Sequence, residues 1–180
     1  AIAHPGDGRI AVEPNIARPM VSSAKIALAY LQKHADALGL DADKLRESNF
    51  LLGVGNASLE KNGPSAGITF ATGIASLVSG KPVPPNVAMT GELELNGRVS
   101  SVSGLRDKLL AAFQDGIDKV IVPAANRAEI EKLPAELRDV LDIVYVETLS
   151  DVLDAAFVPV DARSGPKEIS NHAYDVIAEL

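Results

Sequence analysis

The stretch 65–78, SAGITFATGIASLV, constrains the fold more than any other part of the chain, because the helix that it would form is apolar on every side. A helix without a polar face has to be enclosed by other elements. The chain has 180 residues, of which 47% are hydrophobic, and this is enough to bury such a helix in one domain. We therefore expect a single domain built around a buried helix that ends at Gly80.

The segments around this helix alternate between extended and helical patterns, which predicts an α/β or α+β fold. Apolar runs bounded by turn residues predict strands at 8–14, 49–55, 119–123 and 143–148. Helical spacing predicts helices at 21–39, 41–47, 103–116, 127–133, 134–141 and 149–157. Asn96-Gly97 predicts a hairpin that joins strands at 87–95 and 98–102. We place the domain at residues 1–157 and treat 158–180, which is richer in polar and turn residues, as a C-terminal extension.

Composition excludes several classes of function. The formal charge of −7 and the scattered basic residues argue against nucleic acid or an anionic membrane as a partner. The chain has no cysteine and its three histidines are far apart, so we expect no disulfide, no thiolate nucleophile and no metal site. No apolar run is long enough to cross a bilayer, and the first residues do not resemble a signal peptide. Because the chain begins with Ala rather than Met, we expect it to be a piece of a longer protein.

Ser65 lies at the start of the apolar helix, within the pentapeptide Gly-Pro-Ser-Ala-Gly at 63–67, and two roles fit it. Serine is a preferred N-cap, so the local pattern favours a residue that caps the helix. A nucleophilic role requires a base that takes the proton of the hydroxyl. The pentapeptide has the G-x-S-x-G form of an α/β-hydrolase elbow, but that interpretation requires His172, in the extension, as the base. The two roles are compatible, because free N–H groups at a helix N-terminus also stabilise an oxyanion.

A lysine is the other candidate base for Ser65. Two S-x-x-K pairs, at 22–25 and 58–61, are expected by chance from the numbers of serines and lysines. A lysine distant in sequence matches the Ser-Lys variant of a catalytic triad, and the candidates are Lys81 and Lys108. Since an ordinary lysine has a pKa of about 10.4, a lysine base has to be partly removed from water. Lys108 lies beside leucines on an amphipathic helix and suits this role better than Lys81, which lies among prolines, although lysines in such positions are commonly surface side chains.

Three blocks of the sequence together resemble the proteolytic domain of Lon proteases. They are KNGPSAGIT at 61–69, NVAMTGELELNGRV at 86–99 and SGLRDKLLAAFQDGIDKVIVP at 103–123, in the family's order and with similar gaps. The similarity extends from about Pro14 to Phe157. It implies the Lon proteolytic-domain fold, with mixed sheets packed with helices in a single domain.

The resemblance also implies a function and a set of site residues. Lon proteases hydrolyse peptide bonds with a Ser-Lys dyad, and the matching blocks place the serine at Ser65 and the lysine at Lys108. By the same resemblance, which is to the soluble A-type enzymes, Thr90 orients the lysine. The oxyanion and substrate loop is then formed by Asn62, Gly63, Pro64 and Ala66. The substrates would be unfolded or misfolded polypeptides, and six copies would assemble into a ring with inward-facing sites.

The chain departs from the family pattern at three places. Asn62 stands where the family usually has Asp, residues 55–60 lack the family's Pro-Glu-Gly turn, and Ser103-Gly104 replaces Gly-Gly. These changes bear on loop conformation and on coupling to ATP. The chain also has no G-x-x-x-x-G-K-[S/T] motif, so we expect no cofactor in it. ATP with Mg²⁺ would be used by a separate AAA+ domain of the parent protein.

Two other functions stay open at this point. The first is a catalytically silent assembly domain, in which the altered loop closes the site and the ring serves as a scaffold. The second is an esterase of the elbow type, which needs His172 rather than Lys108. For the protease, we expect unfolded polypeptides and further copies of the chain as partners. We expect a bacterial cytoplasmic location, with the mitochondrial matrix as the second choice.

Overall fold

A parallel sheet separates two hydrophobic cores in the computed structural model, which describes residues 1–55 and 62–158. Its strand order is β4 (Val87–Met89), β7 (Lys119–Pro123), β8 (Asp142–Val146). Successive side chains of β7 point to opposite cores, with Val120 and Val122 in one and Ile121 in the other. A strand covered on both faces shows no polar side, which is why β7 is a nearly continuous apolar run.

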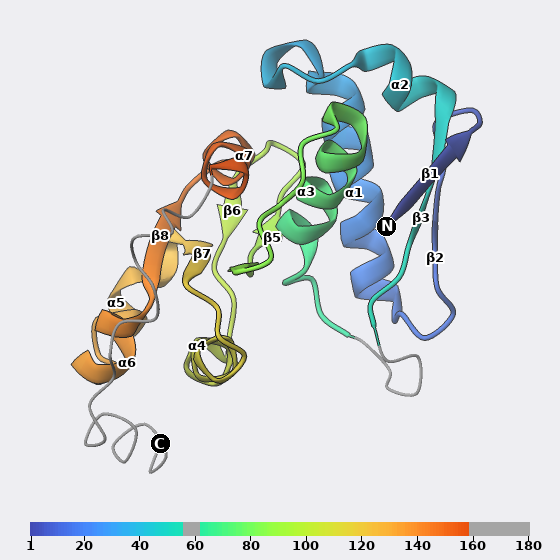
Figure 1. Cartoon of the computed structure of the whole chain (residues 1–180). Coiled ribbons are helices and arrows are strands. Elements are labelled where there is room, and N and C mark those ends of the chain that lie inside the picture. Colours follow the sequence, from blue (N-terminus) through green and yellow to red (C-terminus); the bar gives the residue numbers. More distant parts are fainter. Residues whose placement is uncertain (56–61, 159–180) are drawn as a thin grey trace.

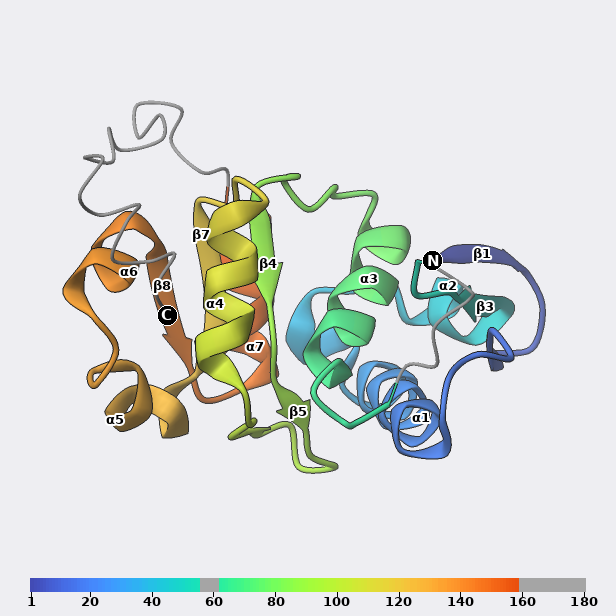
Figure 2. The ribbon, with the colours of Figure 1, turned by 90° about the horizontal axis from the view of Figure 1, so that it is seen from below.

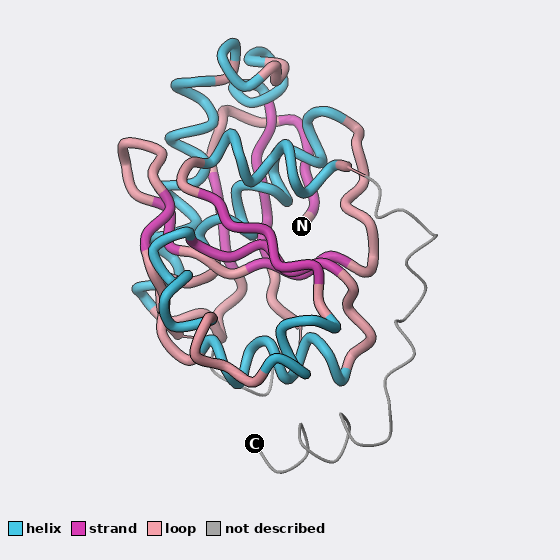
Figure 3. The backbone as a smooth tube through the Cα atoms, turned by 90° about the vertical axis from the view of Figure 1, so that its left-hand side faces the viewer, coloured by secondary structure: helices cyan, strands magenta, loops and turns pink. Residues whose placement is uncertain are grey.

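Helices cover both faces of this sheet. The core that contains Val120 and Val122 is completed by α4 (Leu105–Gln114), α5 (Arg127–Ile130) and α6 (Ala135–Val140). The opposite face is covered by α7 (Leu149–Phe157), and Figure 2 shows α4 in front of the sheet with α7 behind it. Figure 3, which is turned to another side, shows the strands lying between helices. The predicted helices of this half are therefore present, with α5 and α6 shorter than predicted.

The N-terminal half adds two long helices and a second sheet (Figure 1). The sheet has the order β1 (Ile2–Pro5), β3 (Ser48–Leu52), β2 (Ile10–Val12), with β1 antiparallel and β2 parallel to β3. The helices are α1 (Arg18–His34), a 3₁₀ turn at Asp36–Leu38, α2 (Ala42–Glu47) and α3 (Gly67–Ser79). The sequence did not indicate β1, because all four of its residues are exposed and it has no apolar alternation.

The central helix α3 is buried on most of its surface but not on all of it. Ile68, Phe70 and Ile74 are buried in the core that α3 shares with α1 and α7. Thr69 and Leu77 are exposed, and Leu77 keeps 40% of its surface accessible. The prediction of a helix enclosed on every side is therefore wrong, because its neighbours leave one stripe of α3 uncovered. The helix ends as predicted, at Gly80 in the left-handed conformation.

The predicted hairpin is present, and it joins β5 (Glu92–Leu93) to β6 (Val99–Ser100). The N–H of Glu94 donates to the carbonyl of Arg98 at 3.0 Å, which closes the turn. Gly97 has a φ of 86°, as a tight turn of this kind requires.

The prediction of one strand at 87–95 is wrong, because the chain leaves the parallel sheet between β4 and β5. The N–H of Thr90 still donates to a carbonyl of β7 at 3.1 Å. Gly91 then pairs with the start of α3: its N–H donates to the carbonyl of Ser65 at 2.8 Å, and its carbonyl accepts from the N–H of Ile68 at 3.2 Å. This break in the strand brings Thr90 next to Ser65.

The architecture confirms the predicted class, a single α+β domain of mixed sheets and helices. The last described helix, α7, ends at Phe157, and the predicted extension lies outside the described residues from 159 onward. Within residues 1–55 and 62–158, no helix has the length and apolar character that a membrane span requires.

Candidate active site

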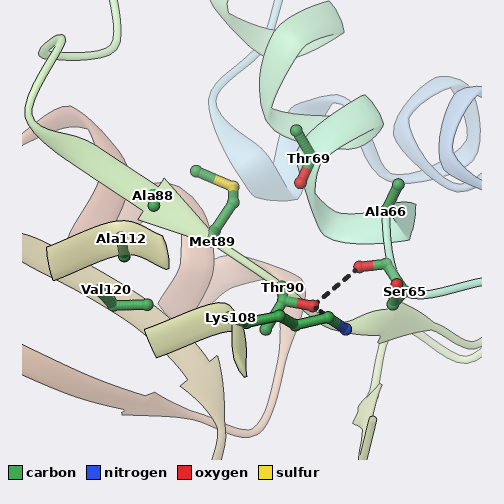
Figure 4. A pocket seen from close by; sticks show the side chains of 9 residues that line it. All are labelled: Ser65, Ala66, Thr69, Ala88, Met89, Thr90, Lys108, Ala112 and Val120. Carbon is green, nitrogen blue, oxygen red and sulfur yellow. Dashed lines mark hydrogen bonds between the residues drawn. The ribbon is translucent and has the colours of Figure 1, made fainter. Parts of the chain in front are cut away.

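A pocket of about 240 Å³ lies where α3, β4, β7 and α4 meet. Figure 4 shows that it brings together side chains from parts of the sequence that are far apart. The wall is formed by Ser65, Ala66 and Thr69 at the start of α3, Ala88, Met89 and Thr90 at β4, Lys108 and Ala112 on α4, and Val120 on β7. The polar groups of Ser65, Thr90 and Lys108 thus share a pocket whose remaining wall is largely apolar.

Ser65 precedes α3 and does not cap it. The N-cap of α3 is Ala66, and no side chain accepts a hydrogen bond at this cap. The interpretation of Ser65 as a helix cap is therefore wrong. Ser65 lines the pocket immediately before the N-terminus of α3, an end of a helix where a negative charge is stabilised.

Hydrogen bonds hold the loop that leads to Ser65. The carbonyl of Pro64 accepts a hydrogen bond from the N–H of Gly67 at 3.1 Å. It also lies 3.3 Å from the hydroxyl of Ser23 on α1, a donor that it shares with the carbonyl of Pro19 at 3.2 Å. Gly63 has a φ of 93°, a conformation that favours glycine. The side-chain oxygen of Asn62 accepts from the N–H of Gly63 at 2.7 Å, and Asn62 itself is exposed and outside the pocket wall.

Thr90 connects the serine loop to the lysine. Its hydroxyl donates to the carbonyl of Ser65 at 3.4 Å and accepts from the ammonium of Lys108 at 3.2 Å. Thr90 is only 7% exposed, so these bonds lie largely out of contact with water. The hydroxyl can make both bonds at once because it is a donor and an acceptor.

The packing of α4 places the side chain of Lys108 in the pocket wall. Leu105 and Leu109 on α4 are fully buried, and Lys108 between them is partly buried. The helix starts after Gly104, which has a φ of 69°, and the N–H of Lys108 donates to its carbonyl at 3.2 Å. Ser103-Gly104 replaces the Gly-Gly pair that is usual in the family. The second position has a positive φ, which favours glycine, and it is still glycine. The substitution therefore affects only the first position, Ser103.

Two opposing effects act on the pKa of Lys108. Burial is the larger effect and lowers the pKa, because the charged ammonium loses solvation. The negative charge of Glu129 on α5 raises the pKa. The net result is a pKa below the ordinary lysine value, which increases the neutral fraction that a general base requires.

The candidate bases other than Lys108 that the structure describes lie outside the pocket wall. Lys81 is exposed and belongs to a second hollow at the C-terminal ends of α3 and α7. The S-x-x-K pair at 22–25 lies on α1, outside the pocket wall. The other pair, at 58–61, and His172 lie outside the described residues.

Several residues of the site were not predicted from the sequence. Ser23 is separated from Pro64 by 41 residues, and no sequence pattern relates the two. Ala112 could have been assigned, because it follows Lys108 by one helical turn and lies on the same side of α4. Met89 precedes Thr90 in a block that resembles the family, but its position in the pocket wall depends on the break between β4 and β5.

The arrangement suits acyl transfer. It combines a serine hydroxyl, an amine with a lowered pKa, and the N-terminus of a helix, which are the parts that such a reaction uses. Among residues 1–55 and 62–158 there is no group of three His, Asp or Glu side chains that could hold a metal ion.

Comparison with known proteins places the chain in a family. The family model for the Lon protease (S16) C-terminal proteolytic domain matches residues 1–159. Lon protease 1 of Thermus thermophilus is 42% identical over 153 residues, which cover 85% of this chain and 19% of that protein. The Lon protease of Salinispora arenicola is 44% identical over 142 residues, which cover 79% of this chain and 18% of that protein.

A third relative, the Lon protease of Nitratidesulfovibrio vulgaris, is 42% identical over 154 residues, which cover 86% of this chain and 19% of that protein. The chain thus spans about a fifth of the length of the relatives that it matches. The match to the family model covers the whole described structure, including every residue of the pocket wall. This chain therefore belongs to the family of Lon protease C-terminal proteolytic domains, a peptidase family.

Proposed function

We propose that this domain is a serine endopeptidase in which Ser65 is the nucleophile and Lys108 the general base. The observation that carries the proposal is the hydrogen bond of 3.2 Å from the ammonium of Lys108 to Thr90, within the pocket that also contains Ser65. Thr90 donates in turn to the carbonyl of Ser65, so the three residues form one connected unit. Membership of a peptidase family supports the same reaction.

In this proposal, neutral Lys108 takes the proton of the Ser65 hydroxyl while the hydroxyl oxygen attacks the peptide carbonyl. The negative charge that develops on the carbonyl oxygen is stabilised by N–H groups at the start of α3. Protonated Lys108 gives its proton to the leaving amine, and an ester with Ser65 forms. Water then attacks the ester while Lys108 takes one of its protons. Lys108 gives this proton to the Ser65 oxygen as the ester bond breaks, which restores the serine hydroxyl and releases the acid product.

The substrate that we propose is an unfolded or misfolded polypeptide. An extended segment can present its scissile bond to Ser65, and the apolar wall of Ala88, Met89, Ala112 and Val120 favours an uncharged side chain beside that bond. Asn62, Gly63, Pro64 and Ala66 form the loop along which the substrate backbone would lie.

We further propose that six such domains form a ring and that a separate domain of the parent protein supplies ATP-driven unfolding. The relatives support the presence of a further domain in the parent, because each is about five times longer than the segment that matches. Quality control of proteins in a bacterial cytoplasm is the setting that we propose for the parent.

The test is degradation of a permanently unfolded protein, such as reduced and alkylated casein, without ATP. Ser65→Ala and Lys108→Ala should each lower the rate by about a thousandfold or more, because each removes a member of the catalytic unit. Lys81→Ala is the matched control for loss of a lysine, and it should retain the full rate, as should His172→Ala.

The outcomes separate the alternatives. Activity that survives Lys108→Ala but not His172→Ala would contradict the dyad and support the esterase-type elbow. If the unsubstituted chain and Ser65→Ala both leave casein intact while sedimentation shows assembled rings, the assembly domain replaces the peptidase. Circular dichroism of each variant excludes unfolding as the cause of a lost rate.

A further inference from the structure

Asn126 forms a clamp on the loop that leads into α4. It ends the 3₁₀ turn Ala124–Asn126 that follows β7, and it is only 5% exposed. Its side-chain nitrogen donates to the carbonyl of Val102 at 2.8 Å, and its side-chain oxygen accepts from the N–H of Val102 at 2.9 Å. A carboxamide satisfies both backbone groups of one residue, because it has a donor and an acceptor side by side.

The clamped residue controls where the helix of Lys108 begins. Val102 lies two positions before Gly104, the N-cap of α4, and Lys108 donates through its N–H to the Gly104 carbonyl at 3.2 Å. Lys108 therefore lies in the first turn of a helix whose starting point is held by Asn126. A shift of this loop would move the ammonium of Lys108 away from Thr90.

The same side chain also holds a carboxylate. The nitrogen of Asn126 donates to Oε2 of Glu129 on α5 at 2.8 Å. Neighbouring Ile130 is fully buried, so the backbone that carries Glu129 is fixed in the core. Glu129 itself is exposed, and this hydrogen bond is what restricts its carboxylate.

Glu129 is the charge that acts on Lys108, whose pKa it raises against the effect of burial. Two elements of the pocket, α3 and β4, carry no charged side chain, and β7 carries one, the buried Lys119. The other charged side chains on α4 and on the helices packed against it are Arg106, Asp107, Arg127, Glu136, Arg138 and Asp139.

We infer that Asn126 is a positioning residue for the proposed base: one buried carboxamide fixes the start of the Lys108 helix and also holds the Glu129 carboxylate. Asn126 is not among the residues that line the pocket. The inference rests on the proposed role of Lys108. It states that a residue outside the pocket determines both the position of that lysine and the charge that acts on it.

The first experiment does not depend on proteolysis. Proteins labelled with ¹³C at the lysine ε-carbon are titrated by NMR, and the Lys108 signal is assigned with Lys108→Arg. Glu129→Gln should lower the pKa of Lys108, because it removes the charge that favours the ammonium. Asn126→Ala should also lower the pKa of Lys108, because the Glu129 carboxylate is no longer held. The double variant should lower this pKa little more than either single variant does.

Asn86→Ala is the matched control. Asn86 also donates to a carboxylate, that of Asp118 at 2.6 Å, but it lies at the opposite end of β4 from Thr90. It should leave the pKa of Lys108 unchanged. Identical Lys108 titrations in the unsubstituted protein, Glu129→Gln and Asn126→Ala would overturn the inference, whether or not the domain is a peptidase.

The second experiment measures peptide hydrolysis against pH. Asn126→Ala should reduce kcat by about 10-fold to 100-fold with little change in KM, because the base is displaced while the substrate loop is intact. Glu129→Gln, an exposed change that leaves the fold intact, should move the acid limb of the profile to lower pH, because Lys108 becomes neutral at lower pH.

Loss of stability in Asn126→Ala with kcat and pH profile unchanged would reduce Asn126 to a structural role and refute the inference. If the unsubstituted domain hydrolyses no peptide, the proposed function fails, and the NMR titration still decides the inference about Asn126.

Discussion

Replacing Gly67 by alanine tests how closely α3 has to approach the hairpin for the site to form. A Cβ at position 67 would lie 2.7 Å from the backbone nitrogen of Leu93 and 3.2 Å from its Cβ. The nearer atom belongs to the backbone of β5, so it cannot rotate away. Either α3 or the hairpin has to move.

The structure indicates what that movement breaks. The N–H of Gly91 donates to the carbonyl of Ser65 at 2.8 Å, and the N–H of Ile68 donates to the carbonyl of Gly91 at 3.2 Å. Weakening these two bonds costs about 0.5–1.5 kcal/mol each, and overpacking costs about 1–3 kcal/mol. Alanine regains at most about 1 kcal/mol of helix preference. Together these terms predict that Gly67→Ala lowers the free energy of unfolding by about 1–5 kcal/mol.

Gly73→Ala in the same helix is the control, and it should change the free energy of unfolding in the opposite direction. A Cβ at position 73 would meet nothing nearer than the Cβ of Ala1 at 3.9 Å. Alanine should therefore stabilise the domain by about 0.5–1 kcal/mol, because glycine costs more conformational entropy in a helix.

Urea denaturation followed by circular dichroism measures both variants, and peptide hydrolysis reports the site. Gly67→Ala should also lower kcat by about tenfold or more, because Ser65 moves relative to Thr90. If Gly67→Ala is as stable and as active as the unsubstituted chain, α3 and β5 do not pack as closely as described here. Equal effects at positions 67 and 73 would contradict the argument in the same way.

Two further substitutions test the site and the fold. Thr90→Val removes the acceptor of the Lys108 ammonium, so kcat should fall by about 10-fold to 100-fold. The pH–rate profile should also shift its acid limb to lower pH, because the charged form loses a partner; an unchanged limb would exclude the contact in solution. Thr148→Ala removes the cap that accepts from the N–H of Asp151 at 3.3 Å and should cost about 1 kcal/mol in urea denaturation. Peptide hydrolysis should be unaffected by Thr148→Ala, since α7 contributes nothing to the pocket wall, and a lower rate would contradict that separation.

Most helices and strands could be predicted because their signals are local. Gly80 and Gly97 mark a helix end and a turn through left-handed backbone conformations that favour glycine. The apolar run of β7 indicates a strand with both faces covered, and it is one. The errors also have a physical cause: β1 is exposed throughout and so has no apolar pattern, although it pairs with β3 in full register.

The candidate site could be predicted only in part. Ser65 and Lys108 were identified through the resemblance to a family, and their catalytic roles stay predictions until the variants are measured. The local pattern of Ser65 favoured a helix cap, and the structure contradicts it, since Ala66 holds that position. Asn126 has no local signal, because its partner Val102 lies 24 residues earlier in the chain.

The sequence by itself determined most of the helices and strands, the turns at Gly80 and Gly97, and the residue types that can carry the chemistry. Propensity, periodicity and glycine conformation act between near neighbours, so they can be recognised without a fold. Only the tertiary structure decided that the strand at 87–95 breaks and that Thr90 joins Ser65 to Lys108, through bonds across 25 and 18 residues of chain. Such contacts depend on how α3, α4 and β7 pack, because these elements belong to the cores on the two faces of the sheet and only their packing brings the hydrogen-bonding groups together.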